Sequence, residues 1–117
     1  MKPLTARQLR HRIEIRRAVK ESDGKGGYIT RWEVLASAMA EVLGLDGREA
    51  VMERVLEGIS SYRIRIRWRA GLTVKASDQV RLNDGSELNI TAPAADPDGK
   101  RQQLIIMADS QSTQRMS

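Results

Sequence analysis

The chain has no cysteine, and among its 117 residues it has a single histidine, His11. Without thiols it can form neither disulfides nor thiolate metal sites, and it has no cysteine nucleophile. When sulfur is absent, a zinc site needs more than one nitrogen ligand. Ser60 and Ser61 have no histidine at a telling spacing to act as their base. We therefore expect no catalytic residues, no metal and no cofactor, and we expect that the protein is not an enzyme.

Aromatic side chains are scarce as well, with two Trp, two Tyr and no Phe. The core must therefore be built from Ile, Leu, Val, Ala and Met. A chain of this length forms one domain and is long enough to bury a single core. A core made of small side chains is easily left loose unless a neighbouring subunit completes it.

Long apolar runs are also missing. No stretch approaches the length of a membrane-spanning helix, and "MKPLTARQLRHR" lacks the apolar segment of a signal peptide. We expect a soluble protein with no membrane partner. The net charge of +5 is uneven, because residues 1–20 are strongly basic and residues 41–57 are mainly acidic. Such a chain could pair head to tail with copies of itself, or the charges could simply belong to a solvated surface.

The segment "LRHRIEIRRAV" alternates with period two, so that His11, Ile13 and Ile15 share one face while Arg12 and Glu14 lie on the other. This pattern predicts a β-strand over residues 9–19. It also predicts that His11 is half-buried and hydrogen-bonded on the apolar face. The glycine-rich "ESDGKGG" that follows predicts the mobile tip of a hairpin.

The next segment, "YITRWEVLASAMAEVLG", begins as a strand and then becomes rich in alanine. We prefer a strand, with Trp32, Val34 and Ala36 on one face. A helix over 33–43 is the competing interpretation, because Ala, Met, Glu and Leu favour helix. The small residues 36–38 could mark a bend, a bulge or the close approach of another chain.

The segment "LDGREAVMERVLEG" predicts an α-helix over about 47–57. Asp46 can cap its start and Gly58 can end it. Its apolar residues recur at helical spacing and most simply pack against a sheet rather than in a partner's groove. They are Val51, Met52, Val55 and Leu56.

The remaining segments predict further strands: "ISSYRIRIRWR", a hairpin within "DQVRLNDGSELNIT" and a last strand in "RQQLIIMA". Together they predict a mainly β fold, a small antiparallel β-barrel or sandwich of about six strands with one inserted helix. We expect a flexible N-terminal arm at 1–8, a single barrel domain at 9–108 and a polar C-terminal tail at 109–117.

Two loops resemble ligand sites only in part. Asp96, Asp98 and Gly99 lack the downstream acidic ligand of a calcium loop. "GKGG" at 24–27 lacks the spacing of a phosphate-binding loop. Turn chemistry explains both better.

In "RIRIRWR" the four arginines alternate with Ile64, Ile66 and Trp68. On a strand the arginines would lie about 7 Å apart on one face, close to the phosphate spacing of a single nucleic-acid strand. No aromatic residue shares that face to stack on bases. Non-specific proximity to DNA, cross-strand salt bridges and a solvated face therefore all remain open. The candidate DNA-facing or lumen-facing residues are Arg63, Arg65, Arg67 and Arg69.

Four segments of the chain, taken in their order and spacing, resemble the corresponding segments of the phage head–tail joining proteins, also called head–tail adaptor, head-closure or stopper proteins. The segments are "LRHRIEIRR", "GGYITRWEVLASAMAEVLGLDGRE", "YRIRIRWRAGLTVKASDQVRLNDGSELNI" and "DPDGKRQQLIIMA". Two departures from the family pattern are Met39 and residues 86–88, where the family often has aromatic residues.

The resemblance implies a small β-barrel with one helix whose copies form a ring at the head–tail connector, below the portal of a DNA-filled capsid. The ring would join the head to the tail and help to retain packaged DNA, with no catalytic residues. The implied partners are the portal or adaptor ring, tail proteins, further copies of this chain and genomic DNA passing non-specifically through the channel. The implied location is the virion, with assembly in the host cytoplasm.

We expect partner contacts from polar segments outside the alternating runs. These are the arm 1–8, the turn 93–100, the tail 109–117 and a hairpin loop. The loop residues are Asp23, Gly24, Lys25, Gly26 and Gly27. A non-specific nucleic-acid-binding barrel and another ring protein of the same assembly, such as a tail-completion protein, are the alternatives.

Overall fold

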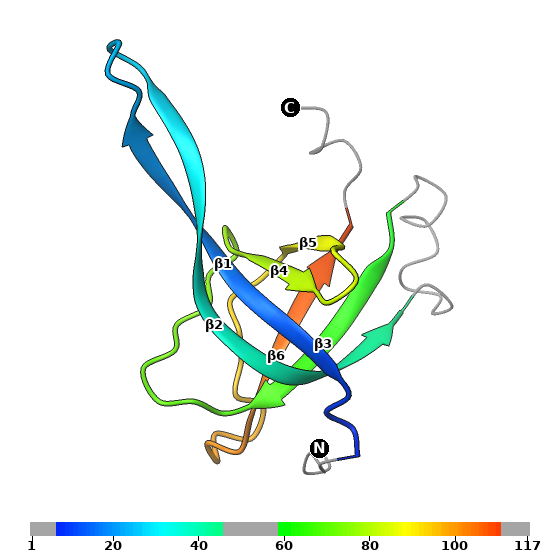
Figure 1. Ribbon diagram of the computed structural model, residues 1–117. Coiled ribbons are helices and arrows are strands. Elements are labelled where there is room, and N and C mark those ends of the chain that lie inside the picture. The colour runs from blue at the N-terminus through cyan, green and yellow to red at the C-terminus, as the bar shows by residue number, and fades with distance from the viewer. Residues whose placement is uncertain (1–6, 46–58, 111–117) are drawn as a thin grey trace.

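The computed structural model describes residues 7–45 and 59–110, which form six β-strands. All strand pairings are antiparallel, and the order β1-β2-β3-β6-β5-β4 closes into a barrel because β4 pairs with β1 (Figure 1). The mainly β fold of about six strands is therefore confirmed. The strands are β1 (His11–Ser22), β2 (Tyr28–Gly44), β3 (Ser61–Arg67), β4 (Gln79–Leu82), β5 (Glu87–Ile90) and β6 (Gln103–Asp109).

The described part of the chain contains no α-helix. The helix predicted over 47–57 lies outside it, and the alternative helix over 33–43 is wrong because that segment belongs to β2. Nor does any segment within residues 7–45 and 59–110 form a helix capable of crossing a bilayer.

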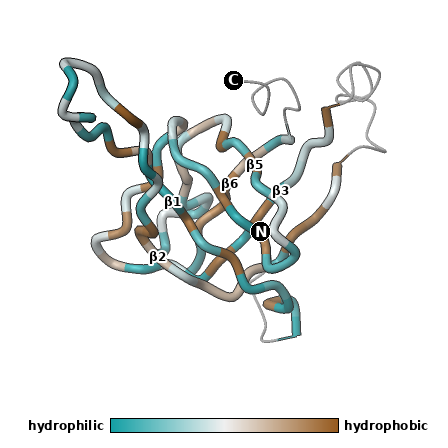
Figure 2. Tube along the Cα trace, turned by 45° about the horizontal axis from the view of Figure 1, so that its top comes forward, coloured by the Kyte–Doolittle hydropathy of each residue, from teal (hydrophilic) through white to brown (hydrophobic). Residues whose placement is uncertain are grey.

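The core is aliphatic, as the scarcity of aromatic residues predicts. Ile64 and Ile66 of β3 enter it together with residues from the other five strands, and each fully buried side chain of this size contributes about 1.5–3 kcal/mol. Hydrophobic stretches also occur outside the barrel, along the hairpin formed by β1 and β2 (Figure 2). The buried cluster comprises Ile13, Ile15, Ala40, Ile64, Ile66, Val74, Val80, Leu88, Ile90, Leu104, Ile106 and Ala108.

A β-bulge interrupts the pairing of β1 with β2. Ile15 pairs with Ala36, whereas the next residue, Arg16, pairs with Val34, so Leu35 is the extra residue. The bulge reverses the alternation along β2. The prediction that Trp32, Val34 and Ala36 share a face is therefore wrong. Ala36 is buried in the interior, whereas Val34 is 52% exposed on the outer face.

The β1–β2 hairpin extends well beyond the barrel (Figure 1). β1 pairs with β4 only over Ile13–Arg16, and β2 pairs with β3 only over Ala40–Gly44. Within residues 17–33, the strand residues therefore pair only with one another, and the remaining residues form the turn. We call this segment, residues 17–33, the projecting hairpin.

His11 is exposed, which corrects the prediction that it is half-buried. The alternation along β1 does place it on the same face as Ile13. The pairing of β1 with β4 begins only at Ile13, however, so the barrel does not cover the first residue of β1.

Candidate functional site

The four arginines of the "RIRIRWR" segment differ sharply in their surroundings. Ile64 and Ile66 are buried in the core, so the intervening arginines of β3 point away from it. This is the alternation that the sequence predicts. The outer surface of β3 is nevertheless not a uniform row of free cations, because the four side chains divide into a covered pair and an exposed pair.

Arg65 is only 5% exposed, and its guanidinium forms an ion pair with the carboxylate of Glu41 on β2. Its Nε donates to Glu41 Oε1 at 2.7 Å, its Nη2 donates to Oε2 at 3.1 Å, and its Nη1 donates to Gln103 Oε1 at 3.3 Å. The Arg65 hydrogen bonds hold the pKa of Glu41 below its ordinary value, although burial alone would raise it. The guanidinium of Arg65 is thus occupied by a cross-strand ion pair and is not presented to a phosphate.

Arg63 is half-buried between Leu43 of β2 and Met107 of β6, its partners in register. Its Nε is buried and has no hydrogen-bond partner among the residues that the structure describes. The charge of Arg63 also helps to lower the pKa of Glu41, after the larger contributions of Arg65. Arg63 therefore belongs electrostatically to the same covered cluster.

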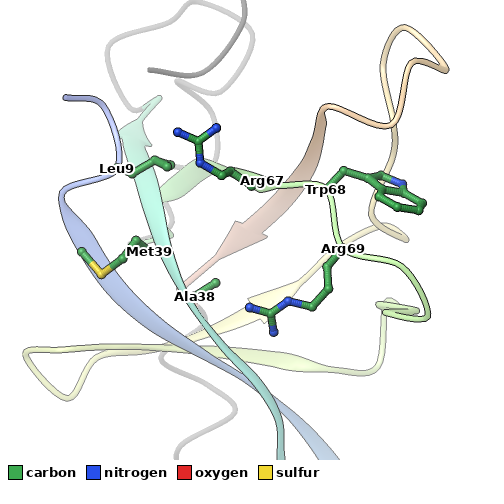
Figure 3. Close-up of a pocket in the computed structure, with 6 residues that line it drawn as sticks. All are labelled: Leu9, Ala38, Met39, Arg67, Trp68 and Arg69. Atoms are coloured by element: carbon green, nitrogen blue, oxygen red, sulfur yellow. The ribbon is translucent and has the colours of Figure 1, made fainter. Parts of the chain in front are cut away.

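Arg67 and Arg69 are exposed and line a groove of about 450 Å³ where β2 and β3 separate. The pairing of the two strands ends at Ala40 and Ile66, so the chain leaves β3 while β2 continues into the projecting hairpin. Figure 3 shows both guanidinium groups on the groove side and the Trp68 ring turned away from them. We call this feature the β2/β3 groove; its lining residues are Leu9, Ala38, Met39, Arg67, Trp68 and Arg69.

A second ion pair fixes the base of the projecting hairpin. The Nε and Nη2 atoms of Arg17 donate to the two carboxylate oxygens of Asp78, each at 2.9 Å, and Nη2 also donates to the carbonyl of Thr73 at 2.9 Å. Asp78 is buried, and its Oδ2 accepts a further hydrogen bond from the backbone N–H of Lys75 at 2.9 Å. Burial raises the pKa of Asp78, but the hydrogen bonds from Arg17 and Lys75 and the nearby charges outweigh it, so that the pKa is lowered.

This pair was missed at the level of the sequence. A signal was present, because Arg17 shares the apolar face of β1 with Ile13 and Ile15. An arginine on a core-facing position of a strand requires a buried acceptor nearby. The identity of that acceptor depends on the pairing of β1 with β4, which brings Asp78 close.

The tip of the projecting hairpin is organised by Asp23. Its Oδ1 accepts hydrogen bonds from the backbone N–H groups of Lys25 at 2.7 Å and Gly27 at 3.1 Å. Gly24 and Gly26 have φ of 77° and 85°, which favours glycine at these positions. The five residues of the candidate contact loop, 23–27, therefore form the turn at the end of the hairpin, far from the barrel (Figure 1).

The bulge at Leu35 gathers exposed apolar side chains on one face of β2. Beyond the bulge the outer face carries Met39 and Leu43, and before it the same face carries Val34 and Tyr28. These are four of the five large hydrophobic side chains that are exposed in the described part of the chain. We call these four residues the outer apolar stripe.

The other expected contact segments are placed only in part. The turn 93–100 lies on the surface and is attached to β6 by a bridge between Ala95 and Ile105. Most of the arm 1–8 and of the tail 109–117 falls outside the described residues. Among the residues that are described, no group of three or more His, Asp or Glu side chains is placed to hold a metal ion.

Fold and surface together define a small closed β-barrel protein with a projecting hairpin, an exposed apolar stripe and a basic groove. The sequence profile of phage head completion proteins matches residues 4–111. The chain therefore belongs to the phage head completion protein family, which confirms the resemblance found in the sequence. It is a structural protein of a phage head and a component of the virion.

Two solved structures share the fold. Protein SF1141 from Shigella flexneri 2a, solved in solution, is 26% identical with a TM-score of 0.69, over 93% of this chain and 98% of that chain. A chain of the virion of a native gene transfer agent particle is 20% identical with a TM-score of 0.55, over 84% of this chain and 90% of that chain. At that identity the second likeness shows the fold alone. A search of curated proteins returned no match.

Proposed function

We propose that the protein forms a ring at the head–tail connector below the portal, where it joins the head to the tail and helps to retain packaged DNA. It acts by binding its neighbours, the portal or adaptor ring and the tail proteins, and it requires neither catalytic residues nor a cofactor. Assembly takes place in the host cytoplasm. Membership of the head completion family supports a position at the opening of the head.

The projecting hairpin is the observation that carries this proposal. Residues 17–33 form strands that pair only with each other, so apart from the contacts of Arg17 with Asp78 and Thr73 at its base the hairpin takes no part in the strand pairings that close the barrel. In a ring, a hairpin of this kind reaches the next subunit or the next ring of the neck. Weak contacts repeated around a ring add up to a firm attachment through multivalency.

DNA contact is a lesser part of the proposal. Because Arg65 is held by Glu41 and Arg63 is half-buried, only Arg67 and Arg69 of the four arginines are free to meet a phosphate. Two contacts would give a slope of log affinity against log salt of about −1 to −2, too small for a dedicated nucleic-acid-binding protein. A salt titration of the isolated protein with short DNA tests this. Tight, steeply salt-dependent binding would favour the alternative function of a nucleic-acid-binding barrel.

The hairpin tip offers the direct test of ring function. Ser22 pairs with Tyr28, so residues 23–27 can be replaced by Asn-Gly, which suits a two-residue hairpin turn. We expect the variant to keep the thermal stability of the wild type while the yield of tailed particles collapses. Arg81→Gln, an exposed change on β4, serves as the control with normal yield. A normal yield of tailed particles from the variant with the shortened hairpin would show that the tip is not needed for head–tail joining.

Electron microscopy tests the location. The labelled protein should appear as a ring at the neck of purified particles and should bind to isolated portal rings. Its absence from the neck would overturn the proposal, and its presence in a lower ring would favour the tail-completion alternative.

A further inference from the structure

The β2/β3 groove carries positive charge that none of the described residues neutralises. Within residues 7–45 and 59–110, no carboxylate contacts Arg67 or Arg69. The nearby Glu41 is already held by Arg65. Other arginines of the sheet do find carboxylates, in the pairs Arg16–Glu87, Arg17–Asp78, Arg31–Glu21 and Arg65–Glu41.

One of the two exposed guanidinium groups is already positioned. Arg69 Nη2 donates to the backbone carbonyl of Ser37 on β2 at 3.0 Å, which fixes the side chain across the mouth of the gap between the strands. Within the described ranges no other acceptor is bound to Arg69, which leaves its remaining N–H groups for a ligand. A positioned guanidinium loses less conformational freedom when it binds a carboxylate in bidentate fashion.

Apolar side chains form the rest of the groove. Leu9, Ala38 and Met39 line it together with the arginines. In Figure 3 Leu9 lies beside the guanidinium of Arg67, and Ala38 lies between Met39 and the guanidinium of Arg69. Met39 is 46% exposed and belongs to the outer apolar stripe, so the groove borders the exposed apolar residues on the outer face of β2. A volume of about 450 Å³ is within the range of sites that hold a ligand.

These features select against nucleic acid as the occupant. The Trp68 ring points away from the guanidinium groups, and the Arg101 guanidinium lies 5.5 Å from its centroid, so it offers no stacking platform to a base in the groove. The sugar–phosphate backbone of a nucleic acid offers only small C–H groups flanked by oxygens, and no aliphatic side chain, to place against Leu9 and Met39. An acidic peptide that also carries aliphatic side chains can place its carboxylates on the arginines and its aliphatic groups against Leu9 and Met39.

We propose that the β2/β3 groove binds an extended acidic segment of a partner protein, with one carboxylate on Arg67, a second carboxylate on Arg69 and a neighbouring aliphatic side chain against Leu9 and Met39. The segment continues along the outer apolar stripe of β2. The inference rests on the proposed function only in taking the partner to be another protein of the particle; the groove chemistry stands on the geometry alone.

The test uses the full chain labelled with ¹³C at the methionine methyl groups, because Met39 is one of the residues that line the groove. The probe is a capped peptide of alternating Glu and Leu, compared with its Gln–Leu counterpart and with oligothymidylate of equal length. We expect the Glu–Leu peptide to shift the Met39 signal, assigned through Met39→Leu, and the Gln–Leu peptide to bind about tenfold more weakly or worse.

Substitutions then locate the charge. Arg67→Gln/Arg69→Gln should reduce affinity about tenfold or more, because both guanidinium–carboxylate contacts are lost. Arg67→Lys/Arg69→Lys should fall between this variant and the wild type, and Arg81→Gln should bind as the wild type does. The three arginine positions changed in these variants and the control, Arg67, Arg69 and Arg81, are exposed outside the core, so the variants should unfold at the wild-type temperature.

Several results would overturn the proposal. Equal binding of the Gln–Leu peptide would show an apolar site without charge recognition, and tighter binding of oligothymidylate would assign the groove to nucleic acid. A Met39 shift that grows with protein concentration alone would assign it to a second copy of this chain. If no probe shifts the Met39 signal, the groove binds none of these ligands and the proposal is wrong. None of these outcomes affects head–tail joining, which is measured separately through the hairpin tip.

Discussion

The carboxylate of Glu41 on β2 accepts two hydrogen bonds from the guanidinium of Arg65 on β3, its direct partner in register, at 2.7 and 3.1 Å. Glu41→Leu removes the acceptor while the cation stays 5% exposed. We expect a loss of about 1–3 kcal/mol in the free energy of unfolding, measured with urea. Glu41→Leu/Arg65→Leu removes both partners and should recover much of that loss. A double variant less stable than the single one would contradict this account.

Asp78 predicts how stability depends on pH. Its pKa in the folded state is lower than its ordinary value of 3.8, so the folded state favours the charged carboxylate. Its contribution is therefore fully present above the unfolded pKa and is lost as the pH falls through the folded pKa. Asp78→Asn should be less stable than the wild type at neutral pH, and the difference should shrink below about pH 4.

The matched control for Asp78 is Glu87→Gln. Glu87 pairs with Arg16, but its side chain is half exposed, and pairs of this kind contribute little. We expect its unfolding curve to follow that of the wild type at every pH. A gap between Asp78→Asn and the wild type that stays constant down to strongly acidic pH would show that lost packing, rather than lost charge, explains the effect.

Two isoleucines test the division between core and surface. Ile64 is fully buried in the barrel, whereas Ile29 is 54% exposed on the projecting hairpin. Ile64→Ala should cost about 2–5 kcal/mol because it leaves a cavity. Ile29→Ala should change stability by about 0.5 kcal/mol or less. Thermal or urea unfolding compares the two, and similar losses at both positions would place Ile29 in a packed environment.

The outer apolar stripe predicts a separation between folding and assembly. Val34→Asp introduces a charge at a position that is already 52% exposed, so the unfolding temperature should stay within a few degrees of the wild type. A charge buried at a subunit contact is costly, so the occupancy of the neck in purified particles should fall strongly. Lys20→Asp, on the adjacent strand of the same hairpin, separates the effect of charge from that of the apolar position. Equal losses from both variants would argue against the stripe.

Much of the barrel could be predicted from alternation alone. Period two in "LRHRIEIRR" and "RIRIRWR" places Ile13, Ile15, Ile64 and Ile66 inside, and the structure buries all four. Burial of one face is a local property of a strand, so the sequence reports it. The strand assignment of residues 33–43 was harder, because helix propensity competes there and only the pairing with β1 and β3 decides.

The candidate site depends on contacts between residues of different strands, and the alternation within one strand does not reveal those contacts. The bulge at Leu35 reverses the faces of β2, and only the register with β1 exposes it. The occupation of Arg65 by Glu41 and the contact of Arg17 with Asp78 both join residues far apart in the sequence. The exposure of His11 follows from where β4 stops rather than from the pattern around it.

β2 is at once a wall of the barrel and one side of the projecting hairpin, with no flexible linker between Tyr28 and Gly44. A force on the tip would therefore pass along a continuous strand, through the bulge at Leu35, into the β2–β3 hydrogen bonds. In mechanical terms the hairpin is an extended arm that is anchored in the barrel wall through β2. The first pair that such a force would reach, Ala40 with Ile66, adjoins the groove where Arg67 and Arg69 lie, so a force on the hairpin and a ligand in the groove would act on the same strand pairing.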